Sequence, residues 1–211
     1  MATSTSTRPP TIGYFARVCS AKGLHILAEA FRLLHNQPDR VPPRLRVSGW
    51  LGESDKAYFN DIQRSLNAAG LGGQMEYVPS PDHASKVRFL QSLDVLSVPT
   101  VYREPKGIYV LEALANGVPV VQPEHGSFPE LIAATGGGLL VKPNDPVDLA
   151  RGLRQLLDNP TLREELGQKG KAAVHSCFHA DRMAEETVRV FEHYLNNPTE
   201  SKTRVPYLDV P

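Results

Sequence analysis

Two carboxylates, Glu104 and Glu112, stand in one short segment, and Gly107 lies between them. The segment is typical of a loop that gives way to a helix over 108–116, with Gly117 ending the helix. A glycine at such a start lets the backbone approach a ligand closely, and the free N–H groups of the new helix make an anion site. One carboxylate therefore precedes the anion site, and the other lies about one turn inside the helix.

Acceptor oxygens on both sides of an anion site suit a ligand with hydroxyl groups on both sides of a phosphate. A nucleotide sugar has that layout. Arg17 and Lys22 flank the loop after the first expected strand, where a guanidinium and an ammonium can neutralise the two charges of a diphosphate. Taken alone, these two residues fit a surface pair at a helix start equally well.

The 102–119 segment resembles family 4 of the retaining glycosyltransferases, which have the two-lobed GT-B fold. The donor-binding lobe of that family carries Glu, seven residues and Glu, then a small-residue helix that ends in Gly-x-Pro-Val-Val, as residues 104–121 do here. Further matches lie at 13–17, 22–23, 125–130 and 137–141. The resemblance runs in order over roughly residues 11 to 196, and this co-linearity makes it specific, whereas a Glu pair alone would be weak.

The resemblance implies a role for each candidate residue. Arg17 and Lys22 would clamp the donor diphosphate and stabilise it as a leaving group. Glu104 would accept hydrogen bonds from the donor sugar and favour an oxocarbenium-like transition state. Alternatively, Glu104 would act as a covalent nucleophile, or would only form an ion pair with a neighbouring basic residue. These three form the expected catalytic set. Glu112 would accept hydrogen bonds from the ribose hydroxyls.

The remaining candidates would border the nucleotide or the sugar through their backbone. Gly107, Ile108 and Tyr109 would offer N–H groups to the phosphates. The others in this set are Gly49, Val78, His125, Gly126 and Ser127.

Apolar runs alternate with amphipathic helical patterns, which predicts an α/β fold with a doubly wound, Rossmann-like parallel sheet. The resemblance makes this a single GT-B lobe with a helical C-terminal extension. Strands are expected at 11–16, 45–49, 75–78, 95–98, 119–122 and 138–141, and only helices after residue 146, at 147–157, 162–174 and 180–196. The first two of these helices are expected to start at Asp148 and Thr161.

Ligands of such sheets bind at the carboxyl ends of the strands. Residues 17, 49, 78, 100–107 and 124–127 all follow directly on expected strands. The candidate chemistry is therefore expected along one edge of the sheet.

The composition is that of an ordinary globular domain: 211 residues, 41% hydrophobic, with no net charge. Overall charge points to neither nucleic acid nor an anionic membrane as a partner. Basic residues are unevenly placed, however, since residues 1–50 hold seven Lys and Arg against two Asp and Glu. We interpret most of them as a solvated surface. No apolar run reaches the ~20 residues that a membrane span needs, so no transmembrane segment is expected.

We expect three parts: a disordered segment at 1–10, a nucleotide-sugar-binding domain at 11–196 and a flexible tail at 197–211. A two-lobed transferase also needs an N-terminal lobe for its saccharide or lipid-linked acceptor, and this lobe is expected to be cut off or separately encoded. The isolated chain should therefore bind donor without turnover. Two cysteines, Cys19 and Cys177, form no motif and fit a reducing cytoplasm; attachment to the inner membrane face would come through the missing lobe.

The sequence thus predicts the C-terminal donor-binding domain of a retaining, metal-independent hexosyltransferase that needs no cofactor. UDP- or GDP-linked donors are expected in preference to ADP-linked ones. The alternatives are a non-catalytic nucleotide-sugar binding or regulatory module and a lobe of another GT-B enzyme such as a sugar-nucleotide epimerase. No metal site is expected at His175, Cys177 and His179, because no fourth ligand stands nearby. The base, the sugar and the acceptor stay open.

Overall fold

The computed structural model describes residues 8–36, 40–79 and 82–197. Residues 1–7 and 198–211, which make up most of the two terminal segments expected to be flexible, lie outside the described residues. Residues 8–10 are described, and here Arg8 forms an ion pair with Asp94, with 3.0 Å between Nη1 and Oδ2.

Six parallel strands form one sheet in the order β3-β2-β1-β4-β5-β6. Their bounds are Thr11–Phe15 (β1), Arg44–Ser48 (β2), Met75–Tyr77 (β3), Val95–Leu96 (β4), Val120–Pro123 (β5) and Gly138–Val141 (β6). The order reverses between β1 and β4, as in a doubly wound sheet. The predicted α/β fold is confirmed, and every expected strand is present within two residues of its predicted ends.

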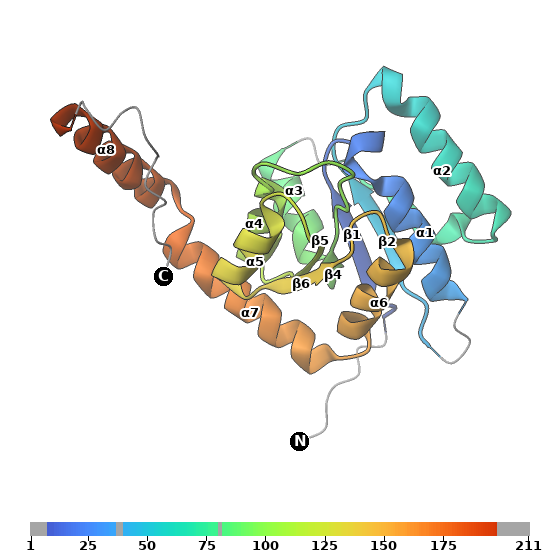
Figure 1. Cartoon of the computed structure of the whole chain (residues 1–211). Coiled ribbons are helices and arrows are strands. Elements are labelled where there is room, and N and C mark those ends of the chain that lie inside the picture. Colours follow the sequence, from blue (N-terminus) through green and yellow to red (C-terminus); the bar gives the residue numbers. More distant parts are fainter. Residues whose placement is uncertain (1–7, 37–39, 80–81, 198–211) are drawn as a thin grey trace.

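Helices cover both faces of the sheet (Figure 1). One face carries α1 (Leu24–His35), α2 (Lys56–Ala68) and α6 (Pro146–Leu157); the other carries α3 (His83–Gln91), α4 (Ile108–Ala115), α5 (Phe128–Thr135) and α7 (Pro160–Cys177). Three short 3-10 turns, η1 (Ser20–Lys22), η2 (Glu53–Asp55) and η3 (Gly72–Gln74), lie in the connections. This layering holds the carboxyl ends of the strands at one edge, where the connecting loops meet.

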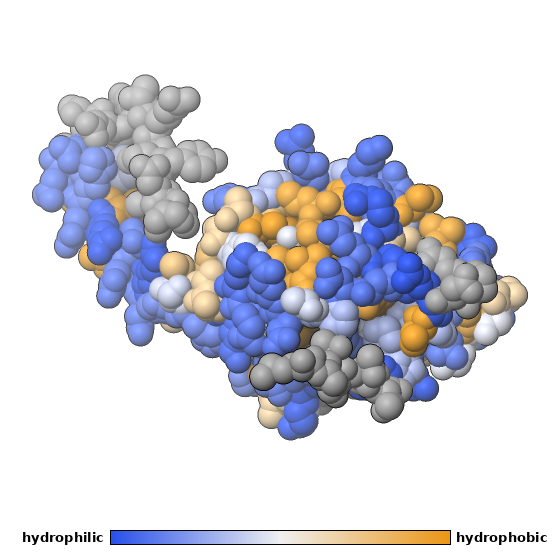
Figure 2. All heavy atoms as spheres, turned by 90° about the horizontal axis from the view of Figure 1, so that it is seen from below, coloured by the Kyte–Doolittle hydropathy of each residue, from blue (hydrophilic) through white to orange (hydrophobic). Residues whose placement is uncertain are grey.

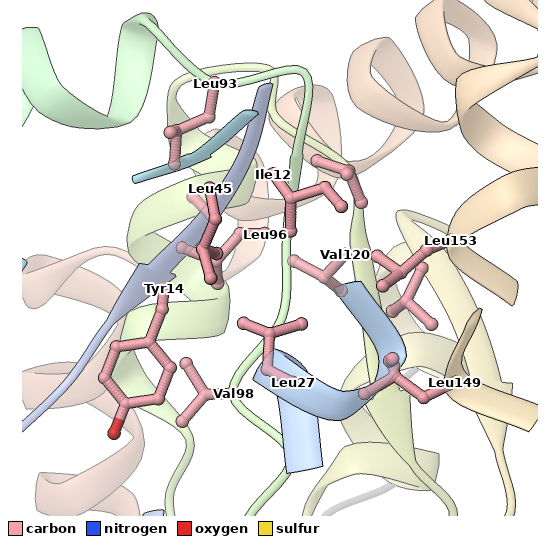
Figure 3. Close-up of a cluster of buried hydrophobic side chains, with 14 of the residues drawn as sticks. Ile12, Tyr14, Leu27, Leu45, Leu93, Leu96, Val98, Val120, Leu149 and Leu153 are labelled. Carbon is pink, nitrogen blue, oxygen red and sulfur yellow. The ribbon is translucent and has the colours of Figure 1, made fainter. Parts of the chain in front are cut away.

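The core between the sheet and α1 and α6 fixes the position of β1 and β4. Ile12 and Tyr14 of β1 are fully buried against Leu27 of α1, and Leu153 of α6 closes the same layer (Figure 3). Each such buried side chain contributes about 1.5–3 kcal/mol of transfer free energy. The two strands that flank the switch point are therefore anchored by fully buried side chains.

Two helix starts differ from the sequence prediction. Helix α6 is capped by Asp145, whose carboxylate accepts from the N–H groups of Val147 and Asp148, rather than starting at Asp148. Helix α7 is capped by Asn159, which accepts from Leu162 N, and begins one residue before Thr161. In both cases a proline takes the first helical position, where its missing N–H costs nothing.

The last helix, α8 (Ala180–Asn196), extends away from the sheet (Figure 1) and has no buried residue. Its apolar side chains Met183, Val188, Phe191 and Leu195 are all more than half exposed. None of the described helices combines the length and the apolar character that crossing a bilayer requires.

Candidate functional site

The candidate site lies where the loops after β1 and β4 face each other. These strands are neighbours, but their connections lead to opposite sides of the sheet, and ligands of doubly wound sheets bind at such a switch point. The two loops are joined because Val101 N donates to Ala21 O at 3.0 Å. Gly23 makes this approach possible: it has φ 74°, and a Cβ there would lie 1.8 Å from Pro99 O.

A buried ion pair joins the two loops. Lys22, from the loop after β1, lies 2.5 Å from Oε2 of Glu104, from the loop after β4, and the two side chains are only 15% and 7% exposed. Burial by itself would raise the pKa of Glu104, but the hydrogen bonds from Lys22 and Tyr102 outweigh it and hold that pKa below its usual value. Glu104 is therefore an ionised acceptor at neutral pH.

Two tyrosines complete the cluster. The hydroxyls of Tyr102 and Tyr109 donate to Glu104 Oε2 at 2.9 and 3.1 Å. Lys22 Nζ also donates to Tyr102 at 2.7 Å and lies 5.1 and 5.2 Å from the two ring centroids. Burial and the charge of Glu104 raise the pKa of Tyr109, so its hydroxyl stays protonated.

Three donors on Oε2 leave the other carboxylate oxygen largely free. Oε1 of Glu104 has one long contact, 3.5 Å from Lys106 N. From the sequence, Tyr109 was expected to contribute only its backbone N–H group, and Tyr102 had no expected role. Both tyrosines lie within five residues of Glu104 in the sequence, and this closeness is the signal that could have identified them.

The loop after β5 wraps around the backbone of Glu104. Gly126 has φ 61°, and a Cβ on it would lie 2.5 Å from both N and O of Glu104, so only glycine fits. Ser127 N donates to Glu104 O at 2.8 Å, and His125 Nε2 contacts Thr100 O at 3.0 Å. His125 Nδ1 and Ser127 Oγ are buried without a hydrogen-bond partner among the described residues. Buried polar atoms of this kind call for a ligand or a water.

Helix α4 starts directly beside the cluster. Gly107 adopts φ 62° as its N-cap and supplies no side-chain hydrogen bond to the first turn, and Ile108 is 56% exposed. Gly107 itself is buried, but the exposed Ile108 side chain leaves this end of α4 at the surface, where the first N–H groups of the helix have no intrahelical acceptor. Such a start favours an anion.

Glu112 lies one turn further along α4 and has a different partner. Its Oε1 is 2.6 Å from Nζ of Lys86, which comes from α3, and both side chains are about a quarter exposed. Lys86 was not among the residues singled out from the sequence.

The remaining candidates line the same edge further along. Gly49 has φ 127° and packs on Ala16, and its carbonyl accepts from Tyr77 at 2.6 Å. Val78 N donates to Val47 O. Arg17 is exposed, and its hydrogen bond with the Cys19 side chain is the main cause that raises the pKa of Arg17. No hydrogen bond or ion pair among the described residues joins Arg17, Gly49, Val78 or Glu112 directly to the Lys22–Glu104 cluster.

The residues considered as metal ligands have other contacts. His175 Nε2 lies 3.1 Å from Ala115 O, and His179 caps α8 by accepting from Arg182 N. Within the described part of the chain, no group of three or more His, Cys, Asp or Glu side chains is arranged to hold a metal ion.

Known proteins resemble both the sequence and the fold. A family model described as glycosyl transferases group 1 matches residues 2–173. An uncharacterized glycosyltransferase of Methanocaldococcus jannaschii is 36% identical over 179 residues, which cover 85% of this chain and 44% of that protein. The chain spans less than half the length of the curated relatives it matches.

Two solved structures share the fold. Sucrose-phosphate synthase from Thermosynechococcus elongatus superposes with a TM-score of 0.78 at 25% identity, over 90% of this chain and 46% of that chain. Anabaena HepE in complex with UDP superposes with a TM-score of 0.79 at 18% identity, over 88% of this chain and 49% of that chain.

Proposed function

The chain belongs to the group 1 glycosyl transferases and has the Rossmann-like fold of a GT-B lobe. We propose that it is the donor-binding lobe of a retaining, metal-independent transferase of family 4. The observation that carries the proposal is the buried Lys22–Glu104 pair beside the open start of α4. This pair brings a cation and an ionised carboxylate beside a helix N-terminus. A nucleoside diphosphate sugar offers matching groups, since its phosphates suit the cation and the helix start and its sugar hydroxyls suit the carboxylate.

The diphosphate would lie at the start of α4, against Lys22 and the exposed Arg17. Lys22 already contacts Glu104, so one ammonium can bridge the sugar-side carboxylate and the phosphate next to the sugar. When the bond between the anomeric carbon and the diphosphate oxygen breaks, its electron pair stays on that oxygen. Lys22, Arg17 and the N–H groups of α4 then stabilise the added charge.

Glu104 would present Oε1 to the sugar hydroxyls while Tyr102 and Tyr109 hold Oε2. Its lowered pKa keeps it charged, so it can stabilise positive charge on the sugar ring rather than donate a proton. His125 and Ser127 contact the backbone of Thr100 and Glu104, and their orphaned polar atoms would meet the sugar directly or through water. Glu112 would accept from the ribose hydroxyls.

UDP- or GDP-linked hexoses are the donors we propose, since a protein of the same fold, HepE, was solved with UDP. The acceptor, a saccharide or a lipid-linked sugar, would be held by an N-terminal lobe. Both cysteines are free, which fits the cytoplasmic location that we propose.

Calorimetry of the folded chain with UDP, GDP and ADP in EDTA tests donor binding without metal. We expect binding of UDP or GDP, and a loss of at least tenfold in the Lys22→Ala variant, since a charged hydrogen-bond partner is worth about 1.5–3 kcal/mol. Lys56→Ala is the matched control, because Lys56 is exposed and pairs only with Glu53 in the described structure. A folded sample that binds none of the three nucleotides at millimolar concentration would overturn the proposal.

Transfer of radiolabelled sugar from UDP- and GDP-linked donors to a lipid and oligosaccharide extract tests the role of the second lobe. We expect no transfer by residues 1–211 alone, because positioning of the acceptor is worth many powers of ten in rate. Transfer is expected once an acceptor lobe is present. Robust turnover by this chain alone would place the acceptor site within it.

A further inference from the structure

A second cluster of charge lies at the opposite, amino edge of the sheet. Viewed from below, hydrophilic side chains surround a hydrophobic area in the middle of this face (Figure 2). The face contains a cavity of about 630 Å³, far from the Lys22–Glu104 cluster. The polar residues that line it include Arg8, Arg44, Arg46, Gln74, Gln91 and Ser92.

Two arginines from β2 point into the cavity from the same face of the strand, because they are two residues apart. Arg44 is exposed and has no hydrogen-bond or ion-pair partner through its side chain among the described residues. Arg46 is held in place: its Nε lies 3.0 Å from Glu76, its Nη1 2.5 Å from Ser92 Oγ, and its guanidinium carbon 5.7 Å from the Phe89 ring centroid. These two hydrogen bonds use two of its five N–H donors.

The basic surface continues into a neighbouring cavity of about 360 Å³, which shares Arg8 with the first. Together the two cavities are lined by six arginines and three carboxylates. These are Arg8, Arg40, Arg44, Arg46, Arg154 and Arg163, against Glu76, Asp94 and Asp158. Since the whole chain has no net charge, an excess of three positive charges on this one edge is a local asymmetry.

Five of these arginines form ion pairs with the three carboxylates, whereas Arg44 has no ion-pair partner among the described residues. An anion that contacts Arg44 would therefore neutralise part of the excess positive charge. Guanidinium forks match the geometry of phosphate oxygens and bind them in bidentate fashion. Gln74, Gln91 and Ser92 add neutral hydrogen-bonding groups around the two arginines of β2. The cavity is wide enough for a diphosphate or a lipid headgroup.

We infer that the amino edge of the sheet binds a phosphate-bearing ligand, with Arg44 and Arg46 as its main contacts. The ligand is a free phosphate compound or the headgroup of an anionic lipid, which share this chemistry. The site is distinct from the proposed donor site, since the two lie at opposite ends of the strands, and it does not depend on the donor proposal.

Calorimetry with inorganic pyrophosphate measures the free-ligand arm. Because pyrophosphate can also enter the donor site, the titration is made on the Lys22→Ala chain. We expect binding that weakens about tenfold on Arg44→Gln, as for a lost charged contact, and that falls with added salt. Arg64→Gln is the matched control, an exposed arginine on α2 that pairs with Asp61.

Sedimentation with vesicles measures the headgroup arm. Vesicles of phosphatidylglycerol in phosphatidylcholine are compared with vesicles of phosphatidylcholine alone. Binding to the anionic vesicles only, lost in Arg44→Gln and kept in Arg64→Gln, identifies a lipid headgroup as the source. Binding of pyrophosphate without vesicle binding identifies a free phosphate compound.

Arg46→Gln is the second variant, and thermal unfolding shows that each variant folds. The inference is overturned if neither probe binds, or if binding is unchanged in both Arg44→Gln and Arg46→Gln. Loss of nucleotide binding in Lys22→Ala, with pyrophosphate binding retained, separates this site from the donor site.

Discussion

Glu104 and Glu112 belong to one loop and helix, yet their surroundings differ. Glu104 is 7% exposed and receives three donors on one oxygen, whereas Glu112 is 28% exposed and its only ion-pair partner among the described residues is Lys86. A buried carboxylate is held in one position, and removal of its partner leaves a costly charge. In a pair that is partly open to solvent, a carboxylate can exchange its partner for a ligand at little cost. The fold therefore pre-organises the proposed sugar side of the site and leaves the ribose side adaptable.

The largest expected effect is on stability. Lys22→Ala should lower the free energy of unfolding by about 3 kcal/mol, because it leaves Glu104 buried without its counter-charge. Urea unfolding of Lys22→Ala and of the Lys22→Ala/Glu104→Ala pair measures this. The double variant should recover part of the loss, since it no longer buries a lone charge. Equal losses in the two variants would mean that Lys22 acts through packing alone.

The same pair predicts a pH dependence. The folded pKa of Glu104 is lowered, so its contribution to stability is present above its unfolded pKa of about 4.3 and is lost as pH falls through the folded value. Acid unfolding monitored by circular dichroism should therefore show a steep loss of stability below about pH 4 in the wild type. Glu104→Gln should flatten this slope. An unchanged slope would exclude Glu104 as its source.

The next effect concerns ligands and would separate the two carboxylates by role. Glu112→Ala should weaken the binding of UDP and of a UDP-sugar alike, by about 1.5–3 kcal/mol. Glu104→Ala should cost a similar amount for the UDP-sugar and far less for UDP. Calorimetry with both ligands measures the difference. Equal losses for the two ligands in both variants would contradict the assignment of sugar side and ribose side.

Tyr109→Phe tests the pre-organisation directly. It removes one of three donors to Oε2 and keeps the ring that covers Lys22, so we expect a loss of about 1.5 kcal/mol in stability. The pKa of Glu104, followed by carboxyl NMR, should rise toward its ordinary value, which a mere packing defect would not cause. Tyr102→Phe is the matched variant. Because Tyr102 is 38% exposed, its loss should be smaller.

The sequence predicted the fold and one edge of the sheet as the site because both follow from local patterns. Strand and helix periodicity is a property of consecutive residues, and the carboxyl ends of parallel strands must share an edge. The contact between Lys22 and Glu104 was not predicted as such, although both residues were placed beside the same ligand.

Side-chain partners from distant elements could not be read in this way. Lys86 meets Glu112 because α3 packs against α4 with a particular rotation, and no spacing in the sequence encodes that rotation. Tyr109 was assigned by its backbone because it follows Gly107, and its hydroxyl contact depends on how the 102–107 loop folds back. The helix starts at Asp145 and Asn159 were readable, however, since each precedes a proline.

The smallest expected effect is on the Glu112 side of the comparison. Lys86→Gln removes the only described ion-pair partner of Glu112, yet both groups keep access to water, so stability should change by less than about 1 kcal/mol. The remaining loss of stability should disappear at about 1 M salt, where the Debye length is about 3 Å. Nucleotide binding should hold or improve slightly, because the ribose hydroxyls no longer compete with an ammonium for Glu112. Urea unfolding at low and high salt, with calorimetry of UDP, measures both. A loss of stability as large as that in Lys22→Ala would show that both carboxylates are held alike, and the contrast between a fixed and an adaptable side would fail.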